Sequence, residues 1–193
     1  MSEGGIQVGV ARIRAGAVLG DESVHGPADI PIDETAVRSA LIEVMDPELP
    51  MVSVVDLGIV HRVEVPAGDR PIRVEILPTF VGCPALEIIK TSFAERLGAF
   101  GRPVQVESTF EVPWTSERIS PAGRAALQAA GIAPPGADSA AMPGGPIELE
   151  PRVPCPHCGS RRTVLENVFG PTQCRTIRYC ADCRQPFEAI KPV

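Results

Sequence analysis

The chain has 193 residues, a formal net charge of −6 and 44% hydrophobic residues, a composition typical of globular proteins rather than fibrous or wholly disordered ones. Its apolar runs fall short of the ~18–20 residues of a membrane span, and its first residues lack the positive region of a secretory signal. We therefore expect a soluble, cytoplasmic protein with no membrane partner.

Charge and cysteine divide the chain into two modules. Residues 1–151 contain 21 acidic and 11 basic side chains, whereas residues 152–193 contain 3 and 7. Five of the six cysteines lie in the second part. In a cytoplasmic chain, clustered cysteines favour metal binding over disulfides.

Residues 1–33 show no sustained period and predict a mobile N-terminal arm, or simply an extension without function. Residues 34–131 predict a small α+β domain with a three-stranded sheet. Asp33 is the expected N-cap of a first helix, which should end near Asp46 because Pro47 disfavours helical geometry before it. Further elements are expected as strands at 60–65, 72–77 and 104–106 and as helices at 84–97 and 121–131.

A linker is expected over residues 132–151, which include five prolines and three glycines. It leads to an all-β ribbon over residues 152–193, with strand-like runs at 163–168, 175–179 and 186–190.

Two C-x-x-C pairs predict a metal site in the ribbon: Cys155, Cys158, Cys180 and Cys183. Two knuckles of this spacing can close a tetrahedral four-thiolate site, and a segment with so few aliphatic residues needs the metal to fold. Zinc is favoured over rubredoxin-like iron or unliganded thiols, because aromatic residues are sparse and two strand-like runs face each other. Cys174 is left over, as a packed thiol, an alternate ligand or a reactive group.

Nucleic acid is not the expected partner, although basic zinc ribbons often bind it. Four thiolates with Zn²⁺ reduce the ribbon's charge to about +2, which neutralises few phosphates. The acidic first module would also repel a phosphate backbone.

Cys83 follows Gly82 and precedes Pro84, between an expected strand and an expected helix. Gly82 permits a tight turn and the close approach of a ligand. At a helix N-terminus the thiolate is stabilised, so we expect a depressed pKa for Cys83. The alternative is a buried cysteine that acts as a small apolar residue.

An acidic turn, Asp46-Pro47-Glu48, follows the first expected helix. Its carboxylates could bind a cation or act as acid and base, although such a triplet is more often a solvated helix end.

Several motifs together resemble a known family. Asp46-Pro47-Glu48, the run 55–60 (VDLGIV) and Thr79-x-x-Gly82-Cys83-Pro84 resemble the iron–sulfur assembly domain shared by bacterial SufT and the eukaryotic cytosolic assembly targeting factor. With Val112-Pro113-Trp114-Thr115 and the four-cysteine ribbon, residues 34–193 are similar to the PaaD family of phenylacetate degradation, grouped with the subunits of the ring 1,2-phenylacetyl-CoA epoxidase.

The resemblance implies an accessory or maturation protein of this epoxidase system, not an enzyme. Cys83 would be the functional thiol, Thr79 and Gly82 part of its motif, and Asp46 and Glu48 the acidic motif. The cargo would be iron or an iron–sulfur cluster, held transiently, and the partners the epoxidase subunits, especially the iron–sulfur reductase. Thiolate suits soft iron and carboxylate suits harder Fe²⁺. One cysteine cannot hold a cluster, so a homodimer or a client would supply further ligands.

Two other functions compete with this one. A non-catalytic structural subunit of the epoxidase would co-purify stoichiometrically with the oxygenase. A cysteine-dependent enzyme needs a base beside the thiol, and His25, His61 and His157 form no visible pair with Cys83.

Overall fold

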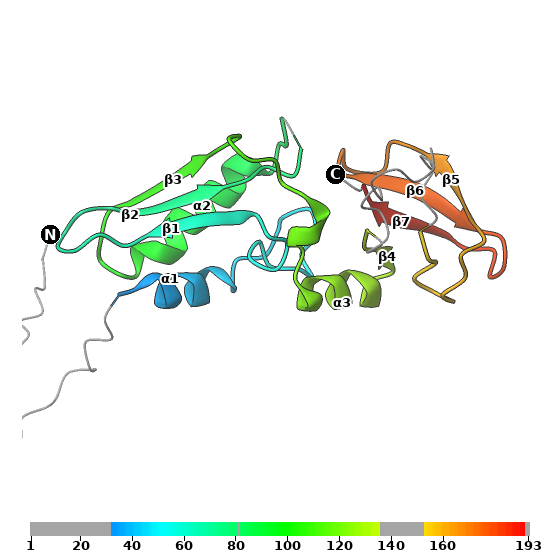
Figure 1. Cartoon of the computed structure of the whole chain (residues 1–193), viewed down its shortest axis with the longest axis horizontal. Helices are drawn as coiled ribbons and strands as arrows, with labels where there is room; N and C mark the ends of the chain where they lie inside the picture. Colours follow the sequence, from blue (N-terminus) through cyan, green and yellow to red (C-terminus); the bar gives the residue numbers. More distant parts are fainter. Residues whose placement is uncertain (1–31, 81, 136–152, 192–193) are drawn as a thin grey trace, which may run out of the picture. The chain divides into compact units, whose positions relative to one another are not determined.

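The computed structural model describes residues 32–80, 82–135 and 153–191, which belong to one compact unit. The expected arm therefore lies almost wholly outside the described residues, as does most of the expected linker. In chain order the elements in Figure 1 are α1 (Glu34–Leu41), β1 (Val60–Glu64), β2 (Ile72–Ile76), α2 (Leu86–Gly98), β3 (Val104–Ser108), the 3-10 helix η1 (Ser116–Arg118), α3 (Pro121–Ala129), β4 (Ile132–Ala133), β5 (Thr163–Asn167), β6 (Arg175–Cys180) and β7 (Pro186–Ile190).

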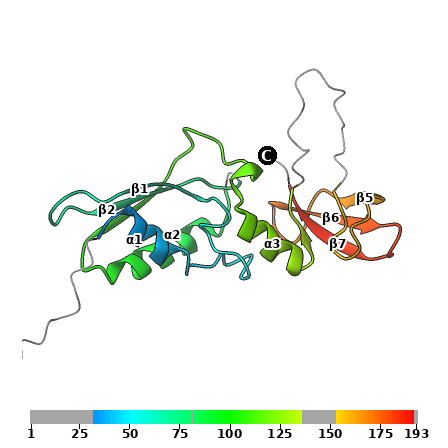
Figure 2. The ribbon, with the colours of Figure 1, turned by 60° about the horizontal axis from the view of Figure 1, so that its bottom comes forward.

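The first sheet has the strand order β1-β2-β3, which confirms the three-stranded α+β domain. β1 and β2 are antiparallel, whereas β2 and β3 are parallel and joined through α2. α1 and α2 cover one face of this sheet (Figures 1 and 2). On β2, Ile72, Val74 and Ile76 are buried and alternate with more exposed charged residues, as a strand with one covered face requires.

Helix α1 begins as predicted, with the Asp33 side chain accepting a hydrogen bond from the Ala36 N–H at 2.8 Å. It ends at Leu41, so the expected end near Asp46 is wrong. The segment after α1 is paired instead with the chain that follows it. The Asp46 N–H donates to the Val52 carbonyl at 3.0 Å, and Val54 donates to Val44 at 2.9 Å. This pairing, rather than Pro47, ends the helix.

The second sheet has the order β4-β7-β6-β5. The three ribbon strands lie where the sequence predicts strands, and they pair antiparallel. β4 was not predicted: Ile132 and Ala133, expected in the linker, pair parallel with β7 and are buried. Ile190 of β7 lies in the same hydrophobic cluster as the core of the α+β domain. Composition missed these contacts because they are made with strands more than fifty residues away.

None of the helices among the described residues combines the length and the apolar character that crossing a bilayer requires.

Candidate functional site

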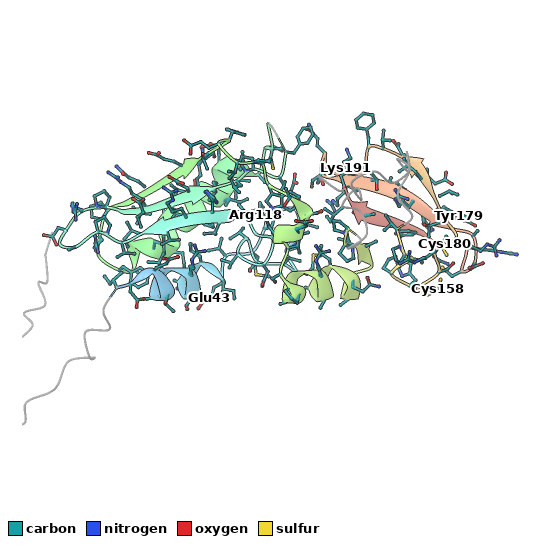
Figure 3. The ribbon with its side chains drawn as sticks, in the orientation of Figure 1. Glu43, Arg118, Cys158, Tyr179, Cys180 and Lys191 are labelled. Carbon is teal, nitrogen blue, oxygen red and sulfur yellow. The ribbon has the colours of Figure 1, made fainter. Side chains whose placement is uncertain are left out.

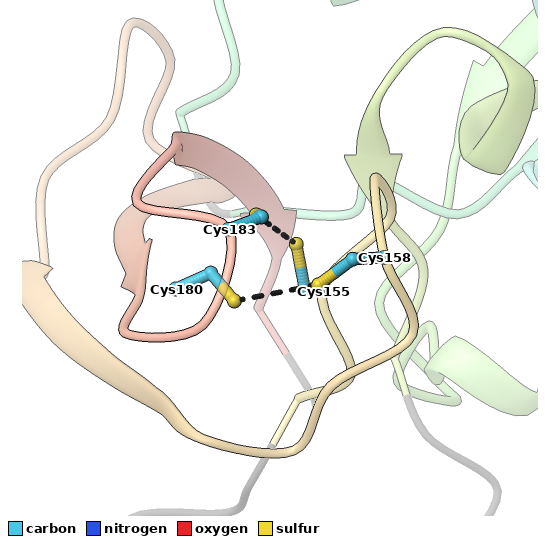
Figure 4. A group of neighbouring side chains, drawn as sticks. All are labelled: Cys155, Cys158, Cys180 and Cys183. Atoms are coloured by element: carbon cyan, nitrogen blue, oxygen red, sulfur yellow. Dashed lines mark hydrogen bonds between the residues drawn. The ribbon is translucent and has the colours of Figure 1, made fainter.

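Four thiols of the ribbon converge at one point (Figure 4). The sulfurs of Cys155 and Cys183 are 3.6 Å apart, as are those of Cys158 and Cys180, and all four lie within 4.8 Å of one another. Cys155 and Cys180 are fully buried, whereas Cys158 is exposed. These are the four residues that the two C-x-x-C pairs predicted.

The two knuckles have the same backbone hydrogen bonds. In each, the first cysteine donates to the carbonyl five residues later: Cys155 to Ser160 at 2.9 Å and Cys180 to Gln185 at 3.0 Å. The residue four positions after each cysteine donates back to it at 2.8 and 2.9 Å. That residue has a left-handed backbone in both knuckles, with φ of 74° for Gly159 and 59° for Arg184. The repeated turn directs both thiols of each pair to one side.

The geometry of the four sulfurs fits a tetrahedral metal. Zn–S bonds of about 2.3 Å place tetrahedral sulfurs about 3.8 Å apart, close to the separations found here. Backbone N–H groups of Cys183 and Asp182 bond to the Cys180 sulfur and lower its pKa to about 6. The four converging sulfurs are the donor set and the spacing of a four-thiolate metal site.

Cys174 is not a member of this cluster. It immediately precedes β6, whereas Cys180 ends that strand. Six residues of extended chain span about 20 Å. Figure 3 shows the same separation along the ribbon, because Lys191, which donates its N–H to the Cys174 carbonyl at 2.9 Å, lies far from Cys158 and Cys180. Of the three interpretations of Cys174, an alternate ribbon ligand is therefore wrong.

A second site is a small, partly enclosed pocket that offers about 50 Å³ of room to water-sized molecules. Its walls are mainly apolar, and its polar groups come from three segments of the chain: Asp46 and Glu48 after α1, Thr79 and Cys83 before α2, and Cys174 and Lys191 from the ribbon. The apolar lining residues are Leu49, Leu57, Ile59, Pro78, Phe80, Leu86, Ile89, Trp114, Ile119 and Ile190.

The acidic turn points a buried carboxylate into this pocket. Asp46 is only 7% exposed, and its Oδ1 accepts the N–H groups of Glu48 at 2.8 Å and Leu49 at 2.9 Å. Burial still raises the pKa of Asp46 above its ordinary value. Burial also raises the pKa of Glu48, and the Asp46 charge raises it further. The triplet is therefore more than a solvated helix end.

The pKa expected for Cys83 was wrong in direction. Burial raises the pKa of the thiol, and the nearby charges of Glu48, Cys174 and Asp46 add to the rise. The reason is that α2 begins only at Leu86, so Cys83 receives a single backbone hydrogen bond, from Ala85, rather than the amides of a helix end. A raised pKa favours the protonated, neutral form of the Cys83 thiol.

The other motif residues play different parts. Thr79 lines the pocket, whereas Gly82 is not among its lining residues. Gly82 has φ of 82°, and a Cβ there would meet no atom within 4 Å. The positive φ of the glycine serves the tight turn before Cys83, as predicted.

Sequence reasoning missed the ribbon side of the pocket. Besides Cys174 and Lys191, it missed Arg175, which is 9% exposed and pairs with Glu188 at 2.6 Å. The Arg175 charge lowers the pKa of both Asp46 and Glu48. The available signal was Cys174 itself, a cysteine outside both knuckles. His61 and His157, by contrast, are not among the pocket-lining residues.

Two family models match this chain, each over one of its modules. Residues 34–108 match a family described as iron–sulfur cluster assembly protein, and residues 142–191 match the PaaD zinc beta ribbon domain. A curated relative matches across both. It is a protein of Escherichia coli (strain K12), provisionally named as a subunit of 1,2-phenylacetyl-CoA epoxidase, and it is 35% identical over 152 residues, covering 78% of this chain and 88% of the relative.

The chain belongs to the PaaD family. Two solved structures resemble it over about half its length. A DUF59 domain from Bacillus anthracis is 28% identical, covers 49% of this chain and 90% of its own, and has a TM-score of 0.45. A conserved hypothetical protein from Thermotoga maritima is 32% identical, covers 49% and 92%, and has a TM-score of 0.43. By the two family models, this PaaD-family chain combines an iron–sulfur assembly domain with a zinc ribbon domain.

Proposed function

We propose that this PaaD-family protein is an accessory factor of a phenylacetyl-CoA epoxidase system, and that it helps to load iron or an iron–sulfur centre into a client protein. The client would be the iron–sulfur reductase of that system. The protein would act without catalysing the epoxidation itself, and in the cytoplasm, where reducing conditions keep its thiols available.

The observation that carries the proposal is the pocket, where a half-buried thiol and two carboxylates face one apolar space. Cys83 supplies a soft ligand for iron, and Asp46 and Glu48 supply hard ones. Their pKa values are all raised, so the empty site favours protons or a cation over three bare negative charges.

The ribbon thiols would hold a resident zinc ion. Zinc would supply structure rather than reaction chemistry there, because four thiolates leave no open coordination position. Elemental analysis of protein purified without added metal should give about one zinc per chain, lost when the knuckle cysteines are replaced. Iron with a rubredoxin-like spectrum would contradict the zinc assignment.

Loading of the apo-reductase tests the proposed function. Under anaerobic conditions with limiting iron and sulfide, the wild-type protein should speed the recovery of the reductase's cluster absorbance. Cys83→Ser should abolish this effect and leave the ribbon zinc unchanged, because oxygen is a poor substitute for a soft ligand. Asp46→Asn should give a smaller loss, since it removes charge but keeps the sulfur. No acceleration by the wild-type protein would refute the proposal.

A second candidate, a non-catalytic structural subunit, is favoured by the name of the E. coli relative, which calls that protein a subunit. Co-purification distinguishes a structural subunit from a loading factor. A structural subunit should remain stoichiometric with the oxygenase through size-exclusion chromatography, and Cys83→Ala should leave growth on phenylacetate normal. A loading factor should separate from the oxygenase, and the same variant should lower the cluster content of the reductase in cells.

A further inference from the structure

Cys174 lies at the opposite end of the ribbon from the four-thiol cluster, so it is not explained by the ribbon metal site. The register of β6 and β7 pairs Arg175 with Ile190 at one end and Tyr179 with Pro186 at the other. The knuckle of Cys180 follows the second end, whereas Cys174 precedes the first.

The position of Cys174 is fixed by its neighbours. Its carbonyl accepts the Lys191 N–H at 2.9 Å, and its sulfur lies 3.1 Å from the Thr172 hydroxyl oxygen. Thr172 also accepts a hydrogen bond from the Arg175 side chain at 2.8 Å, and Arg175 is tied to Glu188 of β7. The thiol is thus held at the strand end, half-buried, and lines the pocket that contains Cys83.

The two thiols and two carboxylates of the pocket interact electrostatically. The charges of Glu48 and Asp46 raise the pKa of Cys174, as they do that of Cys83, and in each thiol burial is the largest cause. Arg175 opposes this by lowering the pKa of Cys174. Two thiols and two carboxylates thus line one mainly apolar pocket, together with Lys191. Thiolate and carboxylate are both donor types that bind ferrous iron.

We propose that Cys174 is the second thiol ligand of the pocket, so that Cys83 of the α+β domain and Cys174 of the ribbon bind one ferrous ion together, assisted by Asp46 and Glu48. The inference rests on the proposed function, which assigns iron cargo to this pocket, and it adds the ribbon as half of the thiol set. On binding, each thiol releases one proton to the buffer and each sulfur donates an electron pair to Fe²⁺. No change of oxidation state is involved.

The proposed ligands of the pocket are less closely gathered than the ribbon thiols. Among the described residues, the ribbon cysteines form the one group of three or more candidate ligands whose atoms lie within 4.8 Å of one another. The pocket ligands would have to draw together by side-chain rotation. Such a site binds more weakly than a preformed one, which is what a cargo site requires.

Metal titration of the full-length protein tests the inference. The ribbon is first loaded with one equivalent of zinc, which the preformed four-thiolate site binds in preference to the pocket, and unbound zinc is removed. Fe²⁺ is then titrated anaerobically, and Co²⁺ serves as a spectroscopic substitute whose thiolate charge-transfer band reports the number of bound sulfurs. The wild-type protein should bind one ion beyond the zinc. Cys174→Ser and Cys83→Ser should each weaken binding about tenfold or more and reduce the cobalt band to about half.

Val164→Ser is the matched control, because Val164 is 50% exposed on β5 and is not among the pocket-lining residues. Its affinity should equal that of the wild type. Zinc content and thermal melting check that each variant is folded. Wild-type affinity and an undiminished cobalt band in Cys174→Ser, or no second ion in the wild type, would overturn the inference.

Loading of the apo-reductase by the same proteins separates the two proposals. If the wild type and Cys174→Ser load the client equally well and bind Fe²⁺ equally well, the second-thiol role fails and the proposed function stands. If both thiols are needed for Fe²⁺ but the wild type loads no client, the proposed function fails and the two-thiol site stands.

Discussion

The two sheets of this protein are stabilised in different ways. Among the described residues, the cluster that includes the core of the α+β domain contains 23 buried hydrophobic residues. The separate cluster of the ribbon contains six, two of which are the cysteines Cys155 and Cys180. Apolar burial contributes about 25 cal/mol per Å², so the first region can fold by packing. The second has little apolar surface of its own, so we expect its folding to depend on metal bound by its thiols. The comparison teaches that apolar burial is unevenly divided within one chain, and that four converging thiols lie where burial is scarce.

Removal of the metal should have the largest effect. Structural zinc contributes about 10–16 kcal/mol in small ribbons, more than the whole stability of a typical domain. A strong chelator should therefore unfold β5–β7, seen as lost protection of their amides in hydrogen exchange, while the amides of β1–β3 stay protected.

The contacts between the regions limit how independent they are. Ile190 is 5% exposed and packs in the larger cluster, and Ile132 pairs with the ribbon through β4. The melting temperature of the α+β domain should fall by a few degrees on chelation as this packing is lost. A single transition abolished by chelator would show that the whole chain folds as one unit.

A substitution in the core of the α+β domain should destabilise that domain and spare the ribbon, the reverse of chelation. Phe93 of α2 is fully buried, so Phe93→Ala should destabilise the α+β domain by about 3–5 kcal/mol, measured by urea unfolding. Ribbon zinc should remain at its wild-type stoichiometry. Phe110→Ala is the control, because Phe110 is 62% exposed and its loss should change stability by less than about 0.5 kcal/mol. Loss of zinc from Phe93→Ala would show that the ribbon is not stabilised independently of the α+β domain.

The alkylation rates of individual cysteines allow the pocket thiol to be compared with the ribbon thiols. The pKa of Cys83 is raised by burial, so in metal-free solution its thiolate fraction at pH 8 should be below that of an exposed cysteine. Its alkylation by iodoacetamide should be slower by a few-fold and should keep rising with pH beyond the range where a free cysteine levels off. Peptide mass spectrometry resolves Cys83 from the other cysteines. If Cys83 were alkylated faster than a free cysteine, the depressed pKa expected for a thiolate at a helix N-terminus would be correct after all.

The smallest effect is expected at the first knuckle. Gly159 has φ of 74° and a Cβ there would meet no atom within 4 Å, and Arg184 occupies the equivalent position of the second knuckle with φ of 59°. Gly159→Asn should therefore lower zinc affinity only slightly, by less than about 1 kcal/mol, because Asn tolerates this region. Competition with a chromogenic chelator measures it. Loss of zinc would show that the two knuckles are not equivalent.

Sequence alone determined the features that depend on near neighbours. Asp33 caps α1 because its side chain reaches an N–H three residues away, and β2 alternates because side chains of a strand point to opposite faces. The ribbon thiols could be predicted because a two-residue spacing brings both sulfurs of a knuckle together, whatever the rest of the fold does.

Tertiary structure alone decided the features that depend on distant partners. Residue spacing could not predict that Cys174 lines the pocket of Cys83, since 91 positions separate them and only the β6–β7 register and the packing of Ile190 bring them to one space. The same holds for β4, whose two residues are a strand only because β7 lies beside them. The direction of the Cys83 pKa was also non-local, because burial and the charges of Glu48 and Asp46 outweigh the one amide supplied by its own turn.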